Sequence, residues 1–166
     1  MDNQETTPRE QCIHEFWGAV PFAWHNVKAH VHKQAAEKHD ITGGQFHILR
    51  MIKGGMHHPS ELAERSKISR PAVTRLVDAL VDNEMVTRSP DENDRRIIRL
   101  ELTGRGEIML DEIFQSTHDW LDEKLQPLND DQLEALSQGF TLLRSVFEKE
   151  DCPPEAQHHG KGTHSI

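Results

Sequence analysis

Two short segments carry the side chains best suited to hydrogen bonding and ion pairing with a partner molecule. In the first, Ser69 can cap a helix whose apolar stripe is expected to face a core. The side chains left facing outward are those of Ser69, Arg70, Pro71, Thr74, Arg75 and Asp78. Arginine and threonine at such positions can reach base edges or phosphates of duplex DNA, and free N–H groups at a helix start favour a phosphate.

The second segment is a polar turn, residues 89–96, which ends in Arg95 and Arg96. Long guanidinium side chains in a turn suit the narrow, electronegative minor groove of DNA. An arginine pair in a turn is also a common solvated feature, so these residues alone do not decide between DNA binding and a plain surface.

Motifs for catalysis are missing from the sequence. It contains no G-x-S-x-G and no H-E-x-x-H, and its glycine pairs, at 43–44 and 54–55, are typical of helix boundaries. We therefore expect no catalytic site and no cofactor.

Twelve histidines raise the question of a metal site. No two of them are four residues apart, the spacing that places two imidazoles on one helical face. We therefore predict no specific metal site, although a folded dimer could still gather histidines from different helices with an acidic residue.

The elements that must position these residues follow from periodicity and capping signals. Helices are expected at 9–38, where Pro21 should kink or divide the helix, from Thr42 to the glycines at 54–55, from Pro59, at 69–81, at 103–126 and at 129–147. Extended runs at 85–88 and 97–102 flank the polar turn and predict a hairpin. Helix, helix, turn, helix and hairpin in this order predict a winged helix-turn-helix.

The predicted fold class is mostly α with a small β-hairpin wing, flanked by N- and C-terminal dimerisation helices. The predicted boundaries are a flexible N-terminus at 1–9, a first dimerisation arm at 10–40, a DNA-binding domain at 41–102, a second arm at 103–150 and a disordered tail at 151–166.

Charge is distributed unevenly along the chain. The formal net charge is -9, yet residues 65–105 hold nine Arg and Lys against seven Asp and Glu, a net charge of +2, so the remainder carries -11. A basic island in an acidic body can bind phosphate while the body fixes which face approaches DNA. With a mean hydropathy of -0.71, no membrane-length apolar run and no secretory signal pattern, we expect no membrane contact and a cytoplasmic location.

Five stretches together resemble the MarR family of bacterial regulators. They are ITGGQFHIL at 41–49, SELAER at 60–65, ISRPAVTRLV at 68–77, DENDRR at 91–96 and LTGRG at 102–106. The resemblance covers roughly residues 10 to 148. It implies a homodimer with interleaved terminal helices, a pseudo-palindromic double-stranded DNA operator, repression as the prior, and often a small-molecule effector site between the dimerisation and DNA-binding regions.

Carried over residue by residue, the resemblance assigns DNA contact to Ser69, Arg70, Pro71, Thr74, Arg75, Arg95 and Arg96. It gives Asp94 the role of holding the wing loop, commonly by pairing with an arginine. One residue departs from the pattern: Glu84 stands where a glycine is expected, and Asn83 could take the left-handed conformation in its place, shifting the turn by one residue.

Three alternatives to the simple regulator stay open. An effector cleft could be lined by aromatic, histidine and leucine side chains, although aromatics at helical spacing are more often core: Trp17, Trp24, His25, Phe46, Leu49 and His118. Cys12, near a helix start, could sense peroxide, although the chain lacks the tyrosines usual beside such a thiol. The third is a winged-helix module that binds a protein through its acidic body.

Overall fold

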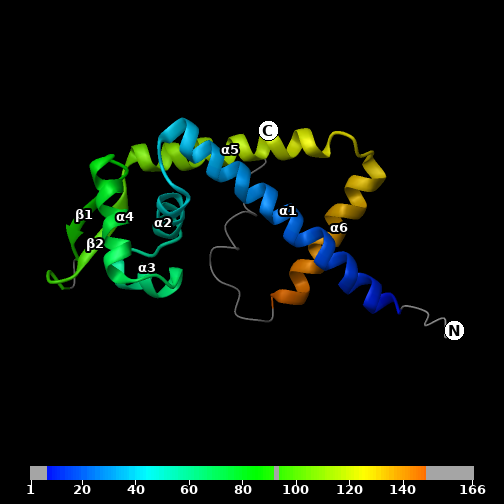
Figure 1. Ribbon diagram of the computed structural model, residues 1–166, viewed down its shortest axis with the longest axis horizontal. Coiled ribbons are helices and arrows are strands. Elements are labelled where there is room, and N and C mark those ends of the chain that lie inside the picture. Colours follow the sequence, from blue (N-terminus) through cyan, green and yellow to red (C-terminus); the bar gives the residue numbers. More distant parts are fainter. Residues whose placement is uncertain (1–6, 92–93, 149–166) are drawn as a thin grey trace.

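The computed structural model describes residues 7–91 and 94–148. It consists of a small winged domain, two long helices that extend from it and a third long helix that follows at their far end (Figure 1). The expected tail at 151–166 and most of the expected flexible N-terminus lie outside the described residues. No helix in the described part of the chain is long and apolar enough to cross a membrane.

The winged domain has the element order that the sequence predicts. It consists of α2 (Gly43–Lys53), α3 (Pro59–Ser66), α4 (Arg70–Asp82), β1 (Val86–Pro90) and β2 (Ile98–Leu102). The two strands pair antiparallel, with Val86 opposite Leu102 and Pro90 opposite Ile98. The predicted winged helix-turn-helix is therefore confirmed, with each strand shifted by one or two residues from its predicted start or end.

The long helices are α1 (Pro8–His39), α5 (Gly104–Leu125) and α6 (Asp130–Phe147). α1 and α5 pack side by side where they leave the winged domain, and α6 turns back toward α1, where the rings of Phe16 and Phe147 lie 6.3 Å apart (Figure 1). We call α1, α5 and α6 the arms.

The start of α1 and its internal proline can be compared with the expectations from the sequence. The helix begins at Pro8, one residue before its predicted start at residue 9, because Thr7 and Glu10 form a capping box in which each side chain bonds the other's backbone N–H. Pro21 lies inside α1 without dividing it. Its ring removes the N–H that the Trp17 carbonyl would accept, and this stretch of α1 is exposed, so water can hydrate that carbonyl.

The other helix boundaries follow local signals in the sequence. Thr42 and Gln45 form the capping box that opens α2, Thr103 accepts the Gly106 N–H at the start of α5, and Asn129 with Gln132 caps α6. Each of these contacts satisfies a backbone donor that a helix start would otherwise leave without a partner.

The core lies in the winged domain and in the adjoining ends of α1 and α5. Its fully buried members include Ile48, Leu49, Leu80, Leu100 and Leu110. They come from α2, α4, β2 and α5, so the first turns of α5 belong to the core of the winged domain. α6, by contrast, has no buried residue in this single chain.

Glu84 itself takes the left-handed conformation, with φ 58°, while Asn83 has φ -85°. The expectation that Asn83 could replace it is therefore wrong. The Glu84 N–H bonds the Val81 carbonyl and the Met85 N–H bonds the Leu80 carbonyl, the pattern of a Schellman motif. Because both Leu80 and Met85 are buried, core packing places the turn at Glu84 whatever its side chain prefers.

Candidate nucleic-acid interface

α4 presents one apolar and one polar face. Val73, Val77 and Leu80 are buried against the domain. The structure brings the predicted DNA-facing set together on the opposite face, where every member is exposed: Ser69, Arg70, Pro71, Thr74 and Arg75. This split arises because α4 keeps the 3.6-residue period that its sequence shows.

Charge on this face is available for a partner. The guanidinium groups of Arg70 and Arg75 make no ion pair with any residue in the described part of the chain. The Thr74 hydroxyl donates to the Arg70 carbonyl (3.1 Å), and its oxygen can still accept. Unpaired arginines on an exposed helix face are free to bind phosphates or guanine edges.

The start of α4 offers fewer backbone donors than expected. Pro71 has no N–H, and the N–H groups of Ala72 and Val73 both bond the Ser69 carbonyl. In the first turn of α4, within the described chain, the Arg70 N–H is therefore the one backbone donor that has no protein partner. The Ser69 side chain does not cap the helix either, so its hydroxyl remains available.

Asp78, on the same face of α4, is tied to the hairpin. Arg88 of β1 donates to its carboxylate, with 2.6 Å between Nη2 and Oδ1. This ion pair neutralises the one carboxylate among the outward-facing residues named above, and it links recognition helix to wing. Sequence reasoning missed Arg88: strand alternation puts it on the same face as buried Val86, yet its side chain is exposed and reaches Asp78.

Arg95 and Arg96 are exposed in the wing turn, and in the described chain neither side chain has an ion-pair partner. Asp94 accepts a hydrogen bond from the Arg96 backbone N–H (3.0 Å), and its carbonyl accepts from the Ile97 N–H (2.9 Å). The loop-holding contact of Asp94 is thus made to a backbone N–H rather than to an arginine side chain.

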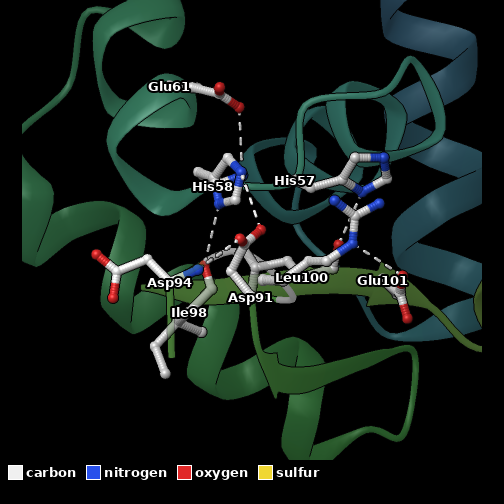
Figure 2. Close-up of polar contacts among 9 residues, drawn as sticks. His57, His58, Glu61, Asp91, Asp94, Ile98, Leu100 and Glu101 are labelled. Atoms are coloured by element: carbon white, nitrogen blue, oxygen red, sulfur yellow. Dashed lines mark hydrogen bonds and ion pairs between the residues drawn. The ribbon is translucent and has the colours of Figure 1, made fainter. Parts of the chain in front are cut away.

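The loop between α2 and α3 also contacts the hairpin (Figure 2). The Leu100 N–H donates to the His57 carbonyl (2.7 Å), and His57 Nδ1 lies 2.9 Å from the Leu100 carbonyl oxygen. His58 Nδ1 lies 3.3 Å from the carbonyl oxygen of Ile98, and its Nε2 lies 3.7 Å from Asp91 Oδ2. Sequence reasoning assigned no role to this histidine pair.

The residues suggested for an effector cleft are not brought together in the single chain. Phe46 and Leu49 belong to the core, with 4% and 0% of their surface exposed, whereas Trp17 and Trp24 are 69% and 60% exposed on α1. His25 and His118 are exposed as well. These positions lie at different depths of the single chain, so it forms no one cleft from them, and the effector site stays a prediction.

The described residues contain no group of three or more histidine, cysteine, aspartate or glutamate side chains placed to hold a metal ion. Cys12 is exposed on α1.

At the joint between α1 and α2, burial lowers the pKa of His32, and the nearby Lys28 lowers it further. The His32 ring packs over Gly43, where an added Cβ would come within 2.6 Å of it.

Comparison with known proteins agrees with this geometry. Residues 41–98 match the model of the MarR family. The chain is 30% identical over 105 residues to the HTH-type transcriptional regulator YpoP of Bacillus subtilis, an alignment that covers 63% of this chain and 74% of that protein. The chain belongs to the MarR family.

Two further similarities extend this MarR-family assignment. The HTH-type transcriptional repressor MdtR of Bacillus subtilis is 34% identical over 82 residues, 49% of this chain and about half of that protein's length, 53%. The solved structure of the transcriptional regulator Tm0710 from Thermotoga maritima superposes with a TM-score of 0.74 at 26% identity, covering 82% of this chain and 96% of that one. This MarR-family chain is thus a transcriptional regulator of the winged-helix type and not an enzyme.

Proposed function

We propose that the chain acts as a homodimer that reads a pseudo-palindromic DNA operator with α4 and the wing, and that it represses transcription until a small effector releases it. The observation that carries the proposal is the exposed face of α4, where Arg70 and Arg75 stand without ion-pair partners among the described residues. The repressor role is supported by the name of the relative MdtR. Because its target is DNA, we place the protein in the cytoplasm.

The dimer is supported by apolar surface that one chain leaves exposed. Trp17, Phe22, Phe140, Leu142 and Val146 are each more than 60% exposed, and all lie on α1 or α6. Burying large apolar side chains is the main driving force of obligate association. Two-fold pairing of the arms would place the two α4 helices in successive major grooves, about 34 Å apart.

Fluorescence anisotropy with labelled duplex from upstream of the protein's own gene tests the proposal. A scrambled duplex and a salt series run alongside, because binding through phosphates weakens steeply as salt rises. We expect tight, salt-sensitive binding that favours the upstream fragment. If random duplexes also fail to bind at low salt while the dimer is intact, the protein-interaction alternative is favoured.

Variants assign the binding to named residues. Arg75→Ala should cost about 1–3 kcal/mol and reduce discrimination between duplexes, whereas Arg96→Ala should weaken binding more evenly across sequences. Arg9→Ala removes the same charge from the first turn of α1, at the opposite end of the molecule from the wing (Figure 1), and serves as the matched control. Equal affinity of the Arg75 and Arg96 variants and the unaltered protein would refute the assigned interface.

A further inference from the structure

Asp91 is an acidic side chain held almost out of solvent at the base of the wing turn, with 12% of the side chain exposed. Its Oδ1 accepts a hydrogen bond from the Asp94 N–H (3.3 Å), and its own N–H donates to the Ile97 carbonyl (2.9 Å). A carboxylate removed from water requires compensating partners. Asp91 therefore organises the turn that carries Arg95 and Arg96.

His58 contacts both ends of this turn from outside the hairpin (Figure 2). Its Nε2 lies 3.7 Å from Asp91 Oδ2, just after β1, and its Nδ1 lies 3.3 Å from the carbonyl oxygen of Ile98, the first residue of β2. Because a carbonyl oxygen only accepts, Nδ1 must carry the hydrogen of this bond. A protonated ring would also direct a second N–H toward the Asp91 carboxylate.

The position of His58 in the chain supports a role other than capping. It is the N-cap residue of α3, a place where serine, threonine, aspartate or asparagine is usual. Its backbone N–H donates to Glu61 (3.3 Å), while the ring points to the hairpin (Figure 2). Those shorter side chains would lack the two ring nitrogens, on opposite sides of the imidazole, that face Ile98 and Asp91.

We propose that His58 is a positioning residue for DNA binding: it clamps the wing turn to the start of α3 through Asp91 and Ile98, and so fixes where Arg95 and Arg96 meet the duplex. The inference rests on the proposed function, since it assigns the wing a contact with DNA. It adds a residue outside α4, at the start of α3, that acts through the hairpin.

The test uses the full-length protein and a double-mutant cycle. His58→Asn keeps a donor for the Ile98 carbonyl and a good N-cap, but the side chain is too short to reach Asp91. We expect His58→Asn and Asp91→Asn each to weaken binding to the upstream duplex by about 3- to 10-fold. In combination with Arg96→Ala the losses should not multiply, because all three changes remove the same wing contact.

A second measurement needs no DNA. Hydrogen exchange at the amides of Asp94, Arg96 and Ile97 should be faster in the free His58→Asn protein than in the unaltered one, because the turn opens more often. His14→Asn, an exposed histidine on α1, should change neither exchange nor affinity.

The outcomes separate the two hypotheses. Losses that multiply fully with Arg96→Ala would overturn the positioning role, since His58 would then act independently of the wing. Unchanged exchange in a His58→Asn protein that still folds would overturn the clamp, and unchanged duplex affinity of that variant would overturn the positioning role. Faster exchange in a protein that binds no duplex would uphold the clamp while refuting the proposed function.

Discussion

The winged domain and the arms use apolar residues in opposite ways. In the winged domain, side chains from α2, α4 and β2 bury one another within a single chain. The start of α5 joins that core, but among the described residues of the other two arms Ala35 of α1 is the one buried residue, and large apolar side chains face outward. The difference indicates that one region completes its own core and the other requires a second surface.

Polar groups show the same contrast. The α1–α5 joint holds two buried atoms without a hydrogen-bond partner in the described chain, His30 Nε2 and Gln34 Oε1, and a third, His39 Nε2, that lies 3.5 Å from Glu112 Oε2. The His30 ring stacks on Trp120, with centroids 4.7 Å apart. Buried polar groups normally have partners, so this joint is the less complete of the two regions.

The largest effect should come from the winged core. Leu80→Ala removes a fully buried side chain and should lower the free energy of unfolding by about 2–5 kcal/mol, because the cavity cannot close completely. Urea denaturation at fixed protein concentration measures it, since dimerisation also contributes to apparent stability. A loss under 1 kcal/mol would contradict a tightly packed core at Leu80.

The matching change on the arms should affect association instead. Phe140 is 61% exposed, so Phe140→Ala should leave the fold intact but raise the dimer dissociation constant by about 10- to 100-fold if this face is buried between copies. Sedimentation analysis over a dilution series checks it, with the exposed Thr141→Ala as control. A stable monomer of the unaltered protein at micromolar concentration would show that the arms do not need a second copy to cover their apolar face.

The junction of the two regions is tested by a pair of glycines. A Cβ at Gly106 would approach the Met85 carbonyl oxygen to 2.3 Å, whereas at Gly104 nothing lies within 4 Å. Gly106→Ala should therefore cost about 1–3 kcal/mol, because α5 must move away from the start of β1. Gly104→Ala should be neutral or slightly stabilising in the same denaturation experiment; similar losses for both would show that the close approach is not needed.

Local signals explain which parts of this structure could be predicted from the sequence. Capping residues such as Thr42 and Asn129, and the apolar period of α4, act over one or two turns, and each predicted element was found. The contacts between His58 and Asp91 and between Asp78 and Arg88 each join a helix to the hairpin. Their geometry depends on how helices pack on the hairpin, which periodicity does not encode.

The turn between α4 and β1 provides the smallest and most discriminating test. Glu84 holds φ 58°, which costs a residue with a Cβ roughly 1–2 kcal/mol, while glycine adds flexibility to the unfolded chain worth about 0.4–1 kcal/mol. Glu84→Gly should therefore stabilise the protein by about 0.5–1 kcal/mol. The ion pair lost with Arg105, 3.5 Å long with both side chains more than 60% exposed, contributes little.

Asn83→Gly is the control for Glu84→Gly, because it should change stability in the opposite direction. At φ -85° glycine relieves no strain, so only the gain in unfolded-state flexibility remains, and stability should fall by about 0.4–1 kcal/mol. Thermal denaturation of both variants at one concentration measures the difference. The reverse result, a stabilising Asn83→Gly and a destabilising Glu84→Gly, would place the left-handed residue at Asn83. The buried pair Leu80 and Met85 would then not determine the turn. Packing within the winged domain would fix less of its own backbone than the contrast with the arms implies.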